Sequence, residues 1–173
     1  MSWLPALSPG VTPLDRVLGL RPNLHADVRT LLAVFVERRL IDPVVLELCR
    51  LRVAQLLGCA SELAIRWQPA RDAGLDDGKI ALLSRWPTDP SFTDAERACL
   101  TVAERFVLDP HGLTDDEAAA ARAHLGDAGV VALLEALALF DGLARFRVML
   151  GVAPEGDAPI VVPGPRSSAP SLH

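Results

Sequence analysis

Apolar residues recur at intervals of three and four along most of this chain, which is the spacing of amphipathic helices. One such stretch predicts a helix over Leu24–Val36. The next predicts a helix that begins at Pro43, because Asp42 is a good capping residue and proline is tolerated at the first helical position. Gly58 should end this second helix, since glycine readily adopts the left-handed conformation that follows a helix.

The same spacing predicts two helices in the middle of the chain. One should run over Cys59–Gly74, although Pro69 should kink it or split it. A shorter one should cover Asp76–Trp86. Two capping boxes then open longer helices, because in each a threonine and a glutamate three residues later can bond the free N–H groups of a first turn. The boxes are Thr93 with Glu96 and Thr114 with Glu117.

The last predicted helix follows Gly126 and runs over Asp127–Leu150. A helix that is apolar nearly all round must be buried on most sides. In a chain of 173 residues a neighbouring subunit covers one face most easily, so we expect a homo-oligomer. The apolar residues of this helix are Val130, Val131, Leu133, Leu134, Leu137, Leu139, Phe140, Leu143, Phe146, Val148, Met149 and Leu150.

These elements predict an all-α fold, a bundle of about six to eight helices in one domain over residues 12–152. Residues 1–11 form an N-terminal extension. Residues 153–173 form a flexible tail rich in proline and serine. No strand is predicted, because the one β-branched run, Ile160–Val162, lies between Pro159 and Pro163.

The composition and charge of the chain argue against a nucleic-acid-binding protein and against a membrane protein. The net charge is −5, which leaves no basic surface for nucleic acid or for an anionic membrane. The longest apolar stretch, Val130–Phe140, contains a glutamate and is too short to span a bilayer. Three cysteines in a domain of ordinary size suit a reducing compartment, so we expect a cytoplasmic protein. Neither a phosphate-binding glycine loop nor a Cys/His zinc pattern occurs, and we expect no cofactor and no metal.

The candidate chemistry lies where the second helix gives way to the third. Cys59 follows Gly58 directly, and the residue three positions later is Glu62, so this segment holds one thiol where a redox dithiol has two. Glu47 lies twelve residues before the cysteine. Cys49 and Cys99 lie within helical apolar patterns, where a free cysteine is most simply a packing residue.

Several motifs in this order resemble the alkylhydroperoxidase D branch of the carboxymuconolactone decarboxylase family. That branch pairs a helix containing "EL-x-RLRVAQ" with a following "GC-x-x-C-x-x-x-H". The resemblance extends over Leu40–Gly151. The matching residues are Asp42, Pro43, Glu47, Leu48, Arg50 to Gln55, Gly58, Cys59, Ala73 to Leu75, Phe92, Thr93, Glu96 to Ala98 and Ala138 to Phe140.

The resemblance implies a helical protein that assembles into trimers or hexamers and acts on a small-molecule substrate. Members with the full motif reduce peroxides with the cysteine pair, while the glutamate and histidine relay protons. Carried over by position, Glu47 matches the relay glutamate and Cys59 matches the first cysteine. The second cysteine falls on Glu62 and the histidine falls on Arg66, so the sequence argues against dithiol chemistry.

Glu62 and Arg66 are four residues apart, which on one helix favours an ion pair. The pair could simply stabilise a helix. Alternatively, Glu62 could act as an acid or base while Arg66 binds an anionic group of the substrate. Three functions therefore stay open: a one-cysteine peroxidase of the antioxidant type, an acid–base enzyme acting on a small carboxylated compound, and a non-catalytic helical oligomer that binds a ligand.

Overall fold

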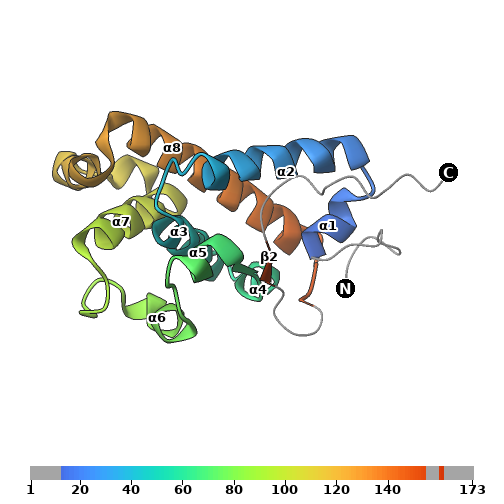
Figure 1. The fold of residues 1–173 in the computed structure, drawn as a ribbon, viewed down its shortest axis with the longest axis horizontal. Helices are drawn as coiled ribbons and strands as arrows, with labels where there is room; N and C mark the ends of the chain where they lie inside the picture. The colour runs from blue at the N-terminus through green and yellow to red at the C-terminus, as the bar shows by residue number, and fades with distance from the viewer. Residues whose placement is uncertain (1–12, 155–159, 162–173) are drawn as a thin grey trace.

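A computed structural model of the chain describes residues 13–154 and 160–161. The predicted all-α class is confirmed, and the described residues contain eight α-helices (Figure 1). The helices are α1 (Pro13–Leu18), α2 (Pro22–Glu37), α3 (Pro43–Leu56), α4 (Ala60–Leu63), α5 (Gln68–Asp72), α6 (Asp77–Ala81), α7 (Asp94–Leu108) and α8 (Asp115–Met149).

Helix α3 is the centre of the core and packs against both α7 and α8. Asp42 caps it as predicted, since its side chain accepts hydrogen bonds from the backbone N–H groups of Val44 and Val45 at 2.8 and 3.2 Å. Gly58 follows the helix with a φ of 63°, the left-handed conformation expected of it. Most residues of α3 are buried, including the charged residues Glu47 and Arg50.

Both capping boxes are present, at the N-termini of α7 and α8. Helix α8 is interrupted at Gly126, whose φ of 68° and ψ of 173° are not helical. The predicted change from one helix to the next at this glycine is therefore confirmed. Beyond it, α8 runs to Met149 and lies behind α2 and α3 (Figure 1).

The segment predicted as one helix over Cys59–Gly74 is different in the structure. Helix α4 ends at Leu63, and α5 begins at Gln68. Pro69 lies in the first turn of α5, where its missing N–H group is not needed, so the break comes before the proline.

The two-residue strand β1 (Arg66–Trp67) fills the gap between these helices and pairs in parallel with β2 (Ile160–Val161). The prediction that no strand forms is wrong at these four residues. A bridge this short depends on tertiary contact rather than on a pattern in either segment. The predicted extension, residues 1–11, and residues 155–159 and 162–173 of the predicted tail lie outside the described residues.

Helix α1 has no counterpart among the predicted helices, and α2 begins two residues before the predicted start. The two helices are joined by a short turn and contact each other, and α2 also contacts α8. Figure 1 shows α2 running along one side of the bundle, with α1 near the C-terminal end of α8. We call α1 and α2 together the N-terminal hairpin.

Helix α8 keeps several large apolar side chains exposed. By length and composition alone it could cross a membrane, a test that the core helix of a soluble protein also passes. It packs against α3 and α7, so one of its faces belongs to the core. The exposed apolar residues of this helix are Val131, Leu134, Phe146, Val148 and Met149.

Candidate functional site

Glu47 and Arg50 lie one turn apart on α3 and form a buried, two-pronged ion pair. Arg50 donates from Nε to Glu47 Oε2 at 2.7 Å and from Nη2 to Glu47 Oε1 at 2.8 Å. Glu47 Oε1 also accepts the backbone N–H of Trp67 at 3.1 Å. Glu47 therefore holds Arg50 and strand β1 in place, which is a positioning role.

Arg50 uses its remaining donors on the segment that follows Cys59. Its Nη2 donates to the carbonyl of Ile65 at 2.9 Å, and its Nη1 donates to the carbonyl of Glu62 at 3.1 Å and to the Glu62 side chain. A guanidinium has five N–H donors, and these contacts use all of them. Arg50 thus fixes the irregular chain between α4 and α5.

Glu62 is the acidic centre of this cluster. It belongs to the single turn of α4 and is only 8% exposed. Its carboxylate forms ion pairs with Arg50 from α3 and with Arg147 from the last turn of α8. Burying one carboxylate between two guanidinium groups offsets the cost of removing its charge from water.

Arg147 is 3% exposed, and its Nε has no hydrogen-bond partner among the described residues. Burial lowers the pKa of Arg147 to about 10, with Arg50 adding to the decrease and Cys59 and Asp15 opposing it. The group still carries its charge at neutral pH. A buried charged side chain with a free donor is costly unless something completes its hydrogen bonds.

A cavity of about 60 Å³ lies against this cluster. One part of its wall is charged, and the other is apolar, including Trp67 and Phe140, whose rings meet edge to face at 5.7 Å. The cavity is lined by Asp15, Leu18, His25, Val28, Arg29, Leu32, Arg50, Glu62, Ile65, Trp67, Phe140, Arg147 and Val161.

The N-terminal hairpin supplies a second charged group to the wall of this cavity. Asp15 of α1 is 4% exposed. One of its oxygens, Oδ1, lies 2.7 Å from His25 Nε2 and accepts a hydrogen bond from Arg29 Nη1 at 2.9 Å. His25 and Arg29 are four residues apart on α2, so one face of this helix binds Asp15 twice.

Cys59 lies just before α4 and is 1% exposed. Its Sγ is 3.5 Å from Ser61 Oγ, and its side chain packs with Ala54 of α3 and Ala144 of α8. Cys59 is not among the residues that line the cavity. It is, however, close enough to Arg147 to be among the groups that raise the pKa of that arginine.

Arg66 faces away from Glu62. It donates from Nη1 to the carbonyls of Leu63 and Ile65 at 2.6 and 2.9 Å, and from Nε to Asp77 at 3.3 Å. The expected pair between Glu62 and Arg66 does not form, because α4 ends before Arg66 and the helical spacing is lost. The structure brings together Glu47, Cys59 and Glu62 but leaves Arg66 outside.

The other two cysteines are core residues. Cys49 and Cys99 are free and fully buried. Burial raises the pKa of Cys99 to about 11 and that of Cys49 well above its ordinary value, with Glu96 adding to both increases. Thiols in such surroundings are poor nucleophiles. No cluster of three or more potential metal ligands occurs within residues 13–154 or 160–161.

Residues 22–105 match the model of the carboxymuconolactone decarboxylase family. The match covers just under half of the chain and supports the resemblance to this family that the motifs indicate. The matched region includes Glu47, Cys59 and Glu62 but ends before α8, so Arg147 lies outside it. No curated protein matches the sequence significantly.

Solved structures share the fold of this chain. One is a protein of unknown function from Agrobacterium tumefaciens, described as a candidate antioxidant defence protein AhpD. It has a TM-score of 0.69 and 24% identity over 81% of this chain and 96% of its own.

Two further similar structures are of the debrominase Bmp8. The ligand-free form has a TM-score of 0.64 and 14% identity, and covers 83% of this chain and 77% of its own. A cysteine-to-alanine variant bound to 2,3,4-tribromopyrrole has a TM-score of 0.66 and 13% identity, and covers 85% of this chain and 79% of its own. At these identities the likeness establishes the fold alone.

The sequence analysis did not identify four ionisable residues of the site. Arg147 lies in the last turn of α8, a helix that the sequence marks only as apolar. Its partner, Glu62, is 85 positions away in the chain. Only the packing of α8 against α3 and α4 brings the two together. The N-terminal hairpin offered a weak local signal, because two basic side chains four residues apart share a helix face. The missed residues are Asp15, His25, Arg29 and Arg147.

Proposed function

We propose that this chain is an acid–base enzyme of the decarboxylase or isomerase kind, acting on a small carboxylated compound. The observation that carries the proposal is the cavity beside Glu62 and Arg147, where the buried Nε of Arg147 has no hydrogen-bond partner within residues 13–154 and 160–161. The substrate-binding role predicted for Arg66 passes in this proposal to Arg147, which lines the cavity.

The two buried arginines have different roles in this proposal. Arg50 has no donor left for a ligand, so it holds Glu62 and the chain around it. Arg147 can bind a substrate carboxylate through its unused Nε, and the planar guanidinium suits such a group. The arriving carboxylate competes with Glu62 for Arg147. Glu62 is thereby released from one of its two cations and becomes a stronger base.

The proposed reaction step is a proton transfer at carbon. The released Glu62 carboxylate removes a proton from the carbon next to the substrate carbonyl, and the electron pair of that C–H bond moves to the carbonyl oxygen. Return of the proton from Glu62 to another carbon completes an isomerisation. A positioned carboxylate contributes about 10²–10⁴-fold to such a step.

The size of the cavity limits the substrate. A volume of about 60 Å³ accommodates about four to six water-sized groups. The apolar part of the wall suits a short carbon chain, while the charged part suits its carboxylate. Compounds such as pyruvate and acetoacetate are of the right order of size and carry acidic C–H bonds.

The test is solvent-deuterium incorporation into a panel of small 2-oxo and 3-oxo acids, followed by NMR, with CO₂ release measured in parallel. Wild-type protein should accelerate exchange or decarboxylation of at least one member. The Glu62→Gln variant should lose about 100-fold or more of that acceleration. Glu96→Gln, which alters another buried, ion-paired glutamate, should retain it. Equal rates in wild-type protein and Glu62→Gln would refute the proposal.

A one-cysteine peroxidase is the second candidate, and the observation that favours it is the nearness of Cys59 to the cationic Arg147, whose pKa it influences. In that reaction the thiolate attacks the O–O bond, releases an alcohol or water, and becomes a sulfenic acid. No second cysteine stands at position 62, so two molecules of an external thiol would have to reduce it and become a disulfide.

Hydroperoxide consumption in the presence of dithiothreitol distinguishes the two candidates. The acid–base proposal expects wild-type protein and Cys59→Ala to consume cumene hydroperoxide equally slowly. A clear loss on this substitution would favour the peroxidase instead. Carboxylate binding without exchange, decarboxylation or peroxide consumption would leave the non-catalytic ligand-binding role.

We propose that the protein works as a cytoplasmic homo-oligomer. The exposed apolar residues of α8 supply the surface, and Val148 and Met149 line a second hollow there with Leu57 and Arg145. Light scattering should give the mass of a trimer or hexamer, and Met149→Glu should shift it toward one chain. A monomeric mass for the wild-type protein would contradict the proposal.

A further inference from the structure

The buried polar atoms that lack a hydrogen-bond partner gather at one place in this molecule. Among the residues that the structure describes, every buried side-chain nitrogen or oxygen atom without such a partner belongs to Arg29 or to Arg147. Arg29 comes from α2 and Arg147 from the last turn of α8, yet both side chains line the cavity beside Glu62. Buried donors normally find acceptors, so two incomplete guanidinium groups at one cavity indicate a ligand with two separate acceptor groups.

Arg29 is held in place through one edge of its guanidinium and keeps a donor on another. Its Nη1 donates to Asp15 Oδ1 at 2.9 Å, and its side chain is 22% exposed. The hydrogens of Nη1 and Nε point along different edges of the planar group, so the bond to Asp15 does not occupy Nε. The Nε atom itself is buried and has no partner in the described part of the chain. Arg29 can therefore donate to a ligand without losing its contact with α1.

The proposed proton transfer creates negative charge on the carbonyl oxygen of the substrate, and this charge requires a donor. Glu62 takes the proton, and Arg147 is engaged by the substrate carboxylate, so neither of them is available to that oxygen. Arg50 uses its donors within the protein. Of the three arginines that line the cavity within the described residues, Arg29 is the one left to serve the carbonyl.

We propose that the substrate is a short oxo acid whose carboxylate binds Arg147 and whose carbonyl oxygen accepts a hydrogen bond from Arg29 Nε. The inference rests on the proposed function and adds the group that stabilises the enolate. When Glu62 removes the proton, the electron pair of the C–H bond forms a carbon–carbon double bond, and the π pair of the carbonyl moves to its oxygen. Arg29 keeps its own proton throughout. Return of the proton from Glu62 to carbon restores the carbonyl, so no other reactant is required.

This arrangement gives the two arginines different kinetic signatures. Arg147 binds a group whose charge does not change during the reaction, so it should govern affinity for any small carboxylate. Arg29 binds an oxygen that becomes negative only as the reaction proceeds, so it should govern the preference for a carbonyl and the rate. A single donor aimed at a developing oxyanion is worth about 10²–10³-fold in rate.

The experiment is calorimetric titration with two pairs of ligands, pyruvate with propionate and acetoacetate with butyrate. The members of each pair have the same charge and the same carbon chain and differ only in the carbonyl oxygen. The variants are Arg29→Met, Arg29→Lys and Arg147→Met. Arg52→Met is the matched control, because Arg52 is another partly buried arginine, paired with Glu104, and does not line the cavity. Thermal melting checks that each variant folds.

Wild-type protein and Arg52→Met should bind the oxo acid of at least one pair about tenfold or more tightly than its partner, as expected for a hydrogen bond from a charged donor. Arg29→Met should reduce this preference to less than about twofold while it still binds propionate and butyrate. Arg29→Lys keeps a cation beside Asp15 but lacks Nε, and it should lose the preference as well. With a saturating oxo acid, deuterium exchange in Arg29→Met should be slower by about 100-fold.

The outcomes separate this inference from the proposal beneath it. A preference for the oxo acid that survives in both Arg29 variants, or wild-type protein that binds propionate or butyrate without such a preference, overturns the role of Arg29 and leaves the carboxylate site intact. Binding of none of the four ligands, or affinities unchanged by Arg147→Met, overturns the carboxylate site and the role of Arg29 with it.

Discussion

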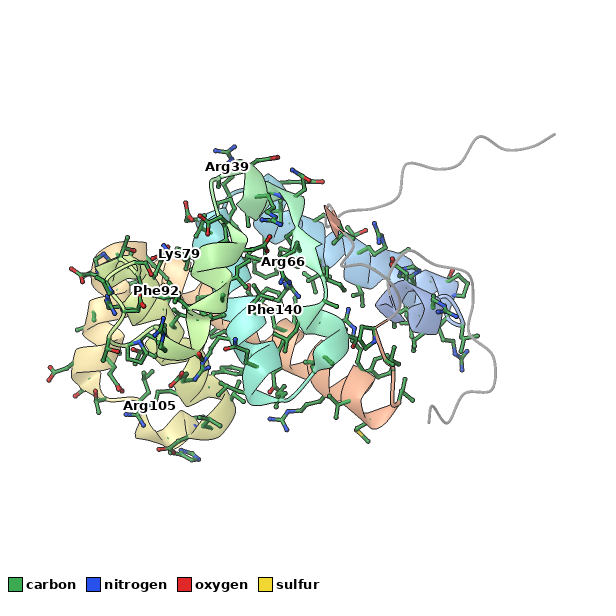
Figure 2. All side chains as sticks on the ribbon, turned by 90° about the horizontal axis from the view of Figure 1, so that it is seen from below. Arg39, Arg66, Lys79, Phe92, Arg105 and Phe140 are labelled. Atoms are coloured by element: carbon green, nitrogen blue, oxygen red, sulfur yellow. The ribbon has the colours of Figure 1, made fainter. Side chains whose placement is uncertain are left out.

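Two buried glutamates of this protein have similar exposure but different surroundings. Glu62 is 8% exposed and Glu96 is 6% exposed. Glu96 lies in the first turn of α7, where both its oxygens bind Lys79 Nζ at 2.7 and 2.8 Å and one also accepts the backbone N–H of Thr93. Figure 2 shows Lys79 and Phe92 near each other and apart from Phe140, which lines the cavity beside Glu62.

The two clusters differ in whether the cation that pairs with the glutamate has a hydrogen-bond donor without a partner among the described residues. Lys79 is held on Glu96 and against the ring of Phe92, 5.4 Å from its centre, so this cluster completes a helix cap. Arg147 pairs with Glu62 and lines a cavity, yet its Nε has no hydrogen-bond partner in the part of the chain that the structure describes. A buried ion pair alone is thus weak evidence for a site. An incomplete one beside a cavity is stronger evidence.

The largest expected effect on stability is at the cluster of Glu96, Lys79 and Thr93, which we call the complete cluster because both oxygens of Glu96 are bound. Lys79→Met should lower the free energy of unfolding by about 2–3 kcal/mol, because it leaves the buried Glu96 carboxylate without its cation. Propionate affinity should not change. Urea unfolding and calorimetry on the same samples check both, and a change in affinity would show that the two clusters are coupled.

The matching substitution at the cluster of Glu62, Arg50 and Arg147, the incomplete cluster, should affect propionate affinity more than stability. Arg147→Met should weaken propionate binding at least about tenfold, which is about 1.4 kcal/mol. Its effect on stability should be less than about 1.5 kcal/mol, because the buried charge is removed together with its partner contact and Glu62 still binds Arg50. A large loss of stability with normal binding would make this cluster structural too.

The helix signals explain how much of the architecture could be predicted. Asp42, Gly58 and the two capping boxes act through neighbours in the chain, so their sequence pattern is sufficient. The break after Leu63 was mislocated because Arg50, thirteen residues earlier, ties down the carbonyls of Glu62 and Ile65.

The candidate site could be predicted only in part, because some of its contacts join residues that are far apart in the sequence. Glu62 could be found because it stands where the family motif has a cysteine. Its partner Arg147 could not, since no local pattern links α4 to the last turn of α8. The motif and the helical spacing both pointed to Arg66, but in the structure its side chain binds Asp77.

Alkaline pH should reveal the buried core thiols near the complete cluster. Below pH 9 Cys99 is protonated in both folded and unfolded protein and has no effect on pH dependence. Between pH 9 and its folded pKa of about 11, only the unfolded thiol ionises, so stability falls as pH rises. At pH 10 this contributes about 1.4 kcal/mol. Urea unfolding of Cys99→Ala against wild-type protein should show a shallower decline, and parallel curves would contradict the assignment.

The smallest effect should follow removal of the family's cysteine. Cys59→Ala should change propionate affinity less than about twofold, because the thiol does not line the cavity, and should cost about 1 kcal/mol of stability through lost packing. Ser61→Ala is the matched control for the neighbouring hydroxyl. A tenfold loss of affinity in Cys59→Ala alone would move the centre of the site toward the thiol.

The central claim is that the chemistry lies at Glu62 and Arg147 rather than at Cys59. A crystal structure of the protein grown with propionate tests it most directly. The carboxylate should lie in the cavity within hydrogen-bond distance of Arg147 Nε, with the carbon chain toward Trp67 and Phe140 and Glu62 beside it. An empty cavity at saturating propionate, or propionate bound elsewhere, would contradict the claim.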